Sequence, residues 1–137
     1  MGKGGCGQLA AWLADEGLAV AGIEYRVSEQ ARFPAQIRDC KSAVRWLRAH
    51  AGKYGLDARR VGAWGDSAGG HLVQLLGSTT GVAEFEEPGI DPDRGSEVQA
   101  VCALYGPSDL TNLPTGRAPL QSLLGVDPAR DPEWATW

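Results

Sequence analysis

The residue in this sequence with the clearest capacity for chemistry is Ser67, in the stretch VGAWGDSAGGHLV (61–73). A serine hydroxyl attacks an ester carbonyl only when it is exposed, aimed at the carbonyl and placed beside a base. A sharp turn from a strand into a helix supplies the exposure and the aim, and it holds the serine backbone in a strained conformation. The residues around Ser67 therefore decide whether it can act as a nucleophile.

Glycines surround Ser67 in the pattern that such a turn requires. Gly65 and Gly69, two residues before and two after the serine, leave room for the turn to close. Gly70 would let the following helix lie close to the sheet. The helix N-terminus directs free N–H groups toward the space above the serine, so we expect the Ala68 N–H to stabilise an oxyanion.

A bare G-x-S-x-G is common by chance, so its context carries the prediction. Residues 61–64 (VGAW) predict a strand, and residues 67–76 predict a helix that opens directly from the turn. Asp66 fills the remaining position of this turn. The alternative interpretation is a glycine-rich turn whose serine only caps the helix.

Two further helices are indicated by apolar residues at helical spacing. The first covers roughly residues 6–16 and precedes Gly17, where a helix-terminating glycine belongs. The second begins near Pro34 and ends at about Ala51, with apolar residues alternating with basic ones, which is typical of an amphipathic helix. The alternating residues are Ile37, Val44, Trp46 and Leu47 against Arg38, Lys41, Arg45 and Arg48.

The remaining segments complete an α/β pattern. Short apolar runs at 18–25 and 98–106 predict two more buried strands, residues 81–96 a surface loop, and Leu120 to Leu124 a short helix. Strands alternating with helices predict one α/β domain, 1–137, with a mostly parallel sheet of about three strands and flanking helices. Ligands bind at the carboxyl ends of such strands, where Ser67 falls.

Several longer motifs occur in a definite order: IEYR (23–26), FPAQIRD (33–39), WLRAHAGKYGLD (46–57), GDSAGGHL (65–72), YGPSDL (105–110) and SLLG (122–125). With these motifs the sequence resembles α/β-hydrolase-fold serine esterases and lipases of the hormone-sensitive-lipase and feruloyl-esterase-like group. The resemblance implies hydrolysis of small-molecule carboxylic esters through a seryl acyl-enzyme on Ser67, with no metal and no cofactor.

Two parts of that family's pattern are missing. The family carries an HGGG loop after an earlier strand, whereas MGKGG at the N-terminus resembles the family's segment just after that loop. The family's acid and base come after YGPSDL, so we expect them beyond Trp137 and the chain to be a fragment. The strand before HGGG would lie between 18–25 and 61–64, so we also expect a gap in the sheet and marginal stability.

Neither histidine replaces the missing base. His71 lies four residues after Ser67 on a helix that runs away from the turn, which favours a packing and hydrogen-bonding role. His50, in the last turn of the long helix, is interpreted as a surface residue. Without a histidine beside the serine no carboxylate can complete a triad, whether Asp66, Asp109 or Asp127. We interpret Asp39 as a helix-face charge and Asp57 as a cap.

Composition excludes several classes of partner. The net charge is −4, from 13 basic and 17 acidic residues that are interspersed, which argues against nucleic acid and anionic membranes. No apolar run approaches the ~20 residues of a membrane span, and no signal peptide is evident, so we expect a cytoplasmic protein. Cys6, Cys40 and Cys102 match no metal-ligand or disulfide spacing, which predicts reduced thiols.

Two alternatives to an esterase stay open. One is a catalytically inactive hydrolase-like scaffold or binding domain, because a serine without its base loses most of its rate advantage. The other is a peptidase of the same fold, since the turn does not distinguish esters from amides. Dinucleotide binding is disfavoured because no G-x-G-x-x-G follows the first predicted strand.

Overall fold

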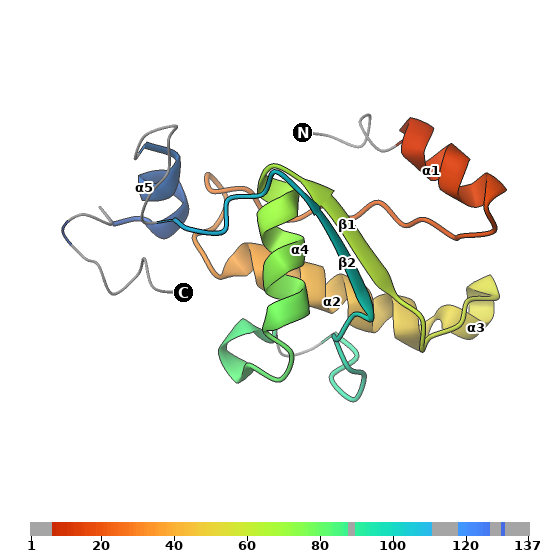
Figure 1. Cartoon of the computed structure of the whole chain (residues 1–137). Coiled ribbons are helices and arrows are strands. Elements are labelled where there is room, and N and C mark those ends of the chain that lie inside the picture. Colours follow the sequence, from red (N-terminus) through yellow and green to blue (C-terminus); the bar gives the residue numbers. More distant parts are fainter. Residues whose placement is uncertain (1–6, 88–89, 111–117, 127–129, 131–137) are drawn as a thin grey trace.

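The computed structural model describes residues 7–87, 90–110, 118–126 and 130. Cys6, the MGKGG segment and Asp127 lie outside these residues. The elements in chain order are α1 (Gly7–Asp15), α2 (Ala35–Ala49), α3 (Ala51–Tyr54), β1 (Gly62–Asp66), α4 (Ala68–Ser78), the 3-10 helix η2 (Ala83–Phe85), β2 (Ala100–Leu104) and α5 (Ala118–Leu124) (Figure 1). The predicted α/β class is confirmed.

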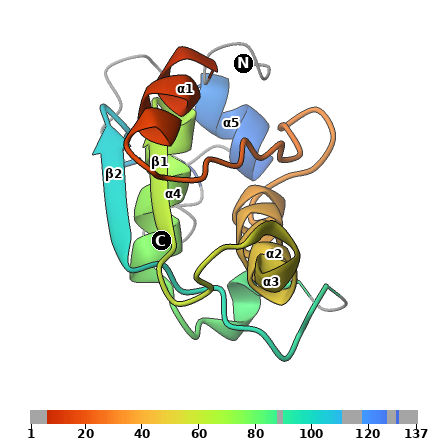
Figure 2. The same cartoon turned by 90° about the vertical axis from the view of Figure 1, so that its right-hand side faces the viewer.

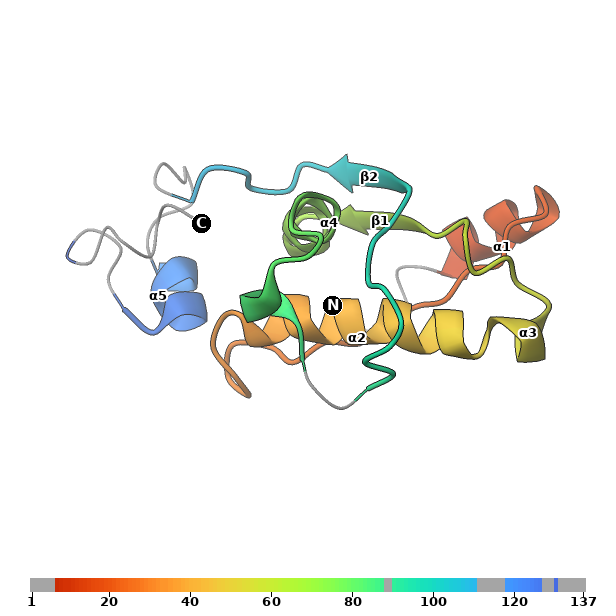
Figure 3. The ribbon, with the colours of Figure 1, turned by 90° about the horizontal axis from the view of Figure 1, so that it is seen from below.

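The sheet within the described residues consists of β1 and β2, which are parallel and paired from Gly62↔Ala100 to Asp66↔Leu104. Helix α4 packs against both strands, and α2 packs against α4. In two perpendicular views α2 lies on the far side of α4 from β2 (Figures 2 and 3). The in-register pairing brings the carboxyl ends of both strands to the same edge of the sheet.

The prediction of a third, buried strand at 18–25 is wrong. This segment is an extended connection between α1 and α2 (Figure 1), and Leu18, Val20 and Ile23 are 55%, 43% and 43% exposed. A strand needs a neighbouring backbone to complete its ladder of hydrogen bonds, and no described strand lies beside 18–25. The apolar composition predicted burial, but composition does not supply the pairing partner.

The helix ends follow local sequence signals. Helix α1 ends in the hydrogen-bond pattern of a Schellman motif: Gly17 has φ 79°, and the Leu18 N–H donates to the Leu13 carbonyl at 3.0 Å. The predicted role of Gly17 is thereby confirmed. Pro34 precedes the first residue of α2, and the Asp57 carboxylate accepts the Arg59 N–H at 3.0 Å, as expected of a cap.

The basic residues of α2 do not form the solvated face that its amphipathic pattern suggests. Lys41 and Arg45 are buried, together with Ile37, Cys40 and Val44. Trp46, counted among the apolar residues of the helix, is instead 40% exposed. The pattern located a helix correctly but assigned its faces wrongly, because another segment covers the basic side chains.

That segment is residues 81–96, predicted as a surface loop. Phe85 is only 3% exposed and packs in the core with residues of α2 and α4. The Lys41 ammonium donates to Glu86 Oε1 at 2.9 Å and to the Thr79 carbonyl at 2.6 Å. Arg45 pairs with the second Glu86 oxygen and donates to the Ile90 carbonyl at 2.9 Å. The loop therefore closes over α2 by ion pairing as well as by apolar burial.

Glu86 lies at the centre of this buried charge cluster. Burial raises its pKa, but hydrogen bonds from Lys41 and Ser96, with the charges of Lys41 and Arg45, outweigh burial and lower the pKa overall. Each cation thus keeps an ionised partner. A buried cation without one would cost several kcal/mol.

Asp39 does more than carry a helix-face charge. Its carboxylate accepts the Arg26 backbone N–H at 2.8 Å and the Arg26 guanidinium at 2.7 Å. These bonds tie the end of the 18–25 segment to α2, although that segment pairs with no strand. The hydrogen bond to Asp39, against a smaller opposing effect of burial, raises the pKa of Arg26.

Two thiols lie within the described residues, and both are free. Cys40 is buried in the core, and burial raises its pKa to about 12, so it stays protonated. Cys102 is exposed in the middle of β2. Across the described part of the chain no helix has the length and apolar character needed to span a bilayer.

We predict that Glu86→Ala lowers the free energy of unfolding by roughly 2 kcal/mol, because it leaves Lys41 and Arg45 buried without a counter-charge. Urea titration followed by circular dichroism measures the change. Glu84→Ala is the matched control: Glu84 is exposed on η2, and removing its side chain should alter stability by less than about 0.5 kcal/mol. Equal effects of the two substitutions would contradict a role for the charge cluster.

Candidate functional site

Ser67 is the single residue between the end of β1 and the start of α4. Its backbone has φ 50° and ψ −118°, a left-handed conformation that costs a non-glycine residue about 1–3 kcal/mol. Its N–H donates to the Leu104 carbonyl at 3.0 Å, and its own carbonyl accepts the His71 N–H at 3.1 Å. The side chain is exposed at the edge where both strands end.

Three glycines let α4 approach the sheet closely enough for this turn. A methyl group on Gly65 would collide with the Gly69 carbonyl. One on Gly70 would lie 2.8 Å from the Leu104 oxygen and 2.9 Å from Gly106 Cα, and one on Gly106 would collide with the Gly70 backbone. Gly106, which the glycine pattern around the serine does not include, is therefore part of the same contact.

The steric expectation for Gly69 is not met. A methyl group there would have no atom within 4 Å. What the turn requires at this position is the close approach of the Gly69 backbone to Gly65, not the lack of a Gly69 side chain. The restriction falls on Gly65 because its Cβ would point into that backbone.

Ala68 is the first residue of α4. A helix has no carbonyl one turn earlier to accept the N–H at this position, so the group is left for solvent or a ligand. The partial positive charge of the helix N-terminus adds to the attraction for a negatively charged oxygen. This geometry is what stabilisation of an oxyanion next to Ser67 requires.

Tyr105 and Asp66 flank the serine. Because Asp66 pairs with Leu104 in the sheet, the residues that come after them, Ser67 and Tyr105, are neighbours at the strand ends. Tyr105 also has a positive φ, 42°, is 77% exposed, and donates its hydroxyl to Asp66 Oδ2 at 3.0 Å. This hydrogen bond raises the pKa of Tyr105. The motif YGPSDL by itself indicates no site role for its tyrosine.

His71 binds the segment after β2 and not the serine hydroxyl. Its Nδ1 lies 2.9 Å from the Pro107 carbonyl oxygen, so Nδ1 carries the proton and donates it. Its Nε2 is buried and has no hydrogen-bond partner in the described part of the chain. Burial lowers the pKa of His71 below 6.5, while the bond to Pro107 opposes that shift. The ring is held by the loop after β2, as the hydrogen-bonding interpretation predicted.

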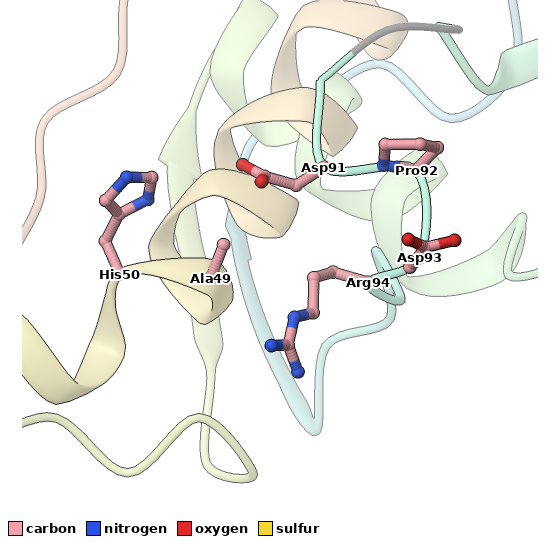
Figure 4. Close-up of a pocket in the computed structure, with 6 residues that line it drawn as sticks. All are labelled: Ala49, His50, Asp91, Pro92, Asp93 and Arg94. Atoms are coloured by element: carbon pink, nitrogen blue, oxygen red, sulfur yellow. The ribbon is translucent and has the colours of Figure 1, made fainter.

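His50 lies between α2 and α3, and α3 lies near the start of β1, away from the turn of this strand into α4 (Figure 1). Its ring stacks on Trp46 with centroids 4.3 Å apart, and its Nδ1 lies 2.8 Å from the Trp46 carbonyl oxygen. It also borders an open pocket of about 540 Å³, with residues 91–94 on the opposite wall (Figure 4). None of the residues that line this pocket belongs to the serine turn.

Among the residues that the structure describes, neither imidazole hydrogen-bonds the Ser67 hydroxyl. The two carboxylates interpreted as a helix-face charge and a cap pair with arginines: Asp39 binds Arg26, and Asp57 binds Arg59 and Arg60. The side-chain hydrogen bond from Arg59, reinforced by its backbone N–H, lowers the pKa of Asp57 to about 2. In the same residues no group of three or more His, Cys, Asp or Glu could hold a metal ion.

Comparison with known proteins decides the family. Residues 3–136 match the family described as BD-FAE. The chain belongs to the BD-FAE family. The protein named "probable carboxylic ester hydrolase LipM" from Mycobacterium tuberculosis is 35% identical over 118 residues, which cover 86% of this chain and 27% of LipM.

Solved structures agree with this BD-FAE assignment. A bifunctional GH43-CE protein of Bacteroides eggerthii superposes with TM-score 0.83 and 38% identity, over 90% of this chain and 18% of that one. The thermophilic esterase Est2 of the planctomycete Thermogutta terrifontis, with propionate bound, superposes with TM-score 0.68 and 27% identity. The match covers 90% of this chain and 46% of Est2. The form of Est2 phosphonylated by cyclosarin superposes with TM-score 0.58 and 31% identity, over 77% of this chain and 38% of that one. The chain adopts part of an α/β-hydrolase fold.

The shared region is only part of each relative. The chain spans about a quarter of the length of the curated relatives it matches, 27% of LipM and 24% of the esterase LipC from the same organism. The family match, residues 3–136, includes β1, the serine turn, α4 and β2. The BD-FAE assignment therefore concerns the part of the fold that carries Ser67.

We predict opposite effects for alanine at two adjacent glycines. Gly70→Ala should lower the free energy of unfolding by about 2 kcal/mol, because its methyl group overlaps the Leu104 and Gly106 backbones. Gly69→Ala, whose methyl group meets open space, should be neutral or stabilise the helix by up to about 1 kcal/mol. Urea unfolding of both variants measures these changes. A similar loss of stability in both would contradict the conclusion that the close contact of Gly70 with the Leu104 and Gly106 backbones excludes a side chain.

We also predict that His71 makes stability depend on pH. Because its pKa is lower when folded, the unfolded chain binds the proton more tightly, so stability is lost as the pH falls below about 6.5. Urea unfolding of wild type between about pH 7 and about pH 5 should show a steeper loss than that of His71→Asn. A His71→Asn slope equal to that of wild type would contradict the assignment.

Proposed function

We propose that the chain carries the nucleophile of a carboxylic-ester hydrolase, Ser67. The observation that carries the proposal is the backbone of this serine: φ 50° between a strand and the N-terminus of α4, with its side chain exposed. Membership of the BD-FAE family, whose curated relatives are named esterases, supports the same chemistry.

In the proposed reaction the Ser67 Oγ attacks the carbonyl carbon of a small ester and gives up its proton to a base. The carbonyl oxygen becomes an oxyanion, which the Ala68 N–H and the α4 N-terminus stabilise. Collapse of the tetrahedral intermediate expels the alcohol and leaves an acyl-serine, which water then hydrolyses. In this scheme Gly65, Asp66, Gly69 and Gly70 form the nucleophile elbow.

The proposal assigns the base to neither described histidine. The Nε2 of His71, the nitrogen free to accept a proton, is buried and meets no hydroxyl among the described residues, and His50 lies between α2 and α3 with its Nδ1 at the Trp46 carbonyl. A base must reach the serine from above the carboxyl edge of the sheet. Asp66 accepts the Tyr105 hydroxyl on Oδ2, and neither described histidine donates to it.

A second candidate function is ligand binding by a hydrolase-like domain without catalysis. The observation that favours it is that no imidazole meets the Ser67 hydroxyl in the described residues. An unactivated serine would leave only binding and oxyanion stabilisation, which accelerate the reaction far less than a complete triad. A peptidase of the same fold would use the same serine turn on amides.

We predict that a fluorophosphonate probe labels Ser67 once the chain is completed with the base and acid that the esterase resemblance implies, and that Ser67→Ala abolishes the labelling. The Thermogutta terrifontis esterase phosphonylated by cyclosarin supports the choice of an organophosphorus reagent. Peptide mapping by mass spectrometry locates the adduct, and Ser78→Ala, which removes an exposed serine at the far end of α4, is the matched control.

Turnover of p-nitrophenyl acetate separates the two candidates. Hydrolysis that is lost in Ser67→Ala and kept in Ser78→Ala supports the esterase. Ligand binding without turnover supports the non-catalytic domain. Labelling that persists in Ser67→Ala would overturn the assignment of the nucleophile.

A further inference from the structure

The segment 104–107, which begins with the last residue of β2, contacts the Ser67 turn and the start of α4 at four consecutive residues. The contacts join Leu104 O to the Ser67 N–H at 3.0 Å, Tyr105 OH to Asp66 Oδ2 at 3.0 Å, the Gly106 backbone to the Gly70 backbone, and Pro107 O to His71 Nδ1 at 2.9 Å. Each residue of the segment thus meets a residue of the turn or of the first turn of α4.

These contacts do not all hold the segment equally. The Tyr105 side chain is 77% exposed, so its bond to Asp66 competes with water. The Gln74 amide reaches the Gly106 carbonyl only at 3.4 Å. The bond from His71 is shorter and comes from a partly buried ring, which makes it the strongest side-chain contact between α4 and the segment.

The hydrogen bond from His71 to Pro107 comes with an energetic penalty at the other ring nitrogen. This second nitrogen, Nε2, is buried and unpartnered in the described residues. A leucine of similar size would avoid that unpaired nitrogen, so packing alone does not explain a histidine here. What a leucine could not supply is the N–H that the Pro107 carbonyl accepts.

We propose that His71 is a positioning residue for Ser67. By holding the Pro107 carbonyl it keeps residues 104–107 against α4, and the Leu104 carbonyl then holds the Ser67 N–H and the strained φ of that residue. The inference rests on the proposed function only in that the positioned residue is the proposed nucleophile. The mechanical link from His71 to the Ser67 backbone can be measured without any activity.

Amide hydrogen exchange of the 137-residue chain, followed by NMR, tests the link. The Ser67 N–H should be protected in wild type by its bond to Leu104. In His71→Leu it should exchange roughly fivefold faster or more, the factor expected when one hydrogen bond that restrains the segment is lost. His71→Asn keeps a donor near the position of Nδ1 and should restore most of the protection.

Two references keep this test specific. The amides of Cys40 and Val44 in the core of α2 should exchange as in wild type, which shows that the variants remain folded. His50→Leu makes the same change at the other histidine, which contacts its own helix, and should leave Ser67 exchange unchanged. Wild-type exchange at Ser67 in His71→Leu, or equal acceleration in the leucine and asparagine variants, would overturn the proposal.

Fluorophosphonate labelling of the same variants distinguishes this inference from the proposed function. If wild type labels, His71→Leu should label more slowly and His71→Asn should recover the rate. If wild type does not label, Ser67 is not activated in this chain, and the exchange data alone decide whether His71 holds the Ser67 backbone.

Discussion

The strained backbone of Ser67 is the constraint on which the rest of the described structure depends. A residue at φ 50° persists only where its surroundings offset the cost. Here the offset comes from α4, which packs on both strands because Gly65, Gly70 and Gly106 leave no side chain between backbones. The hydrogen bond from the Ser67 N–H to the Leu104 carbonyl then fixes the turn to β2. The strained serine, the close glycine contacts and the pairing of the two strands therefore depend on one another.

The opposite side of α4 is secured by a different kind of interaction. Lys41 and Arg45 of α2 are buried yet remain paired with Glu86, which reaches them from the 81–96 loop. Ion pairs of this kind stabilise little over apolar packing, but they penalise any arrangement that leaves a charge alone. The cluster therefore specifies where the loop and α2 meet. It also keeps α2 against α4, whose other side carries the sheet.

Local patterns predicted the helices and the serine turn well because each depends on neighbouring residues. Gly17 ends α1 through its own backbone conformation, and the glycines around Ser67 permit the turn from β1 into α4. The prediction of a strand at 18–25 failed for the opposite reason. Strand formation there depends on a neighbouring strand, and the described residues include none beside it. The prediction that the basic residues of α2 face solvent failed for a similar reason. Their partner Glu86 lies 41 residues after Arg45 in the chain. Neither partner can be inferred from local spacing.

The sequence by itself determined the family, the α/β class and the single serine worth testing, because motif order and glycine spacing are written along the chain. Only the tertiary structure decided what surrounds that serine. It brought Tyr105 beside Ser67, turned His71 toward Pro107 and left His50 between α2 and α3. The physical reason is that strand register and helix packing join residues about 40 positions apart, and these contacts form only when the sheet and α4 come together.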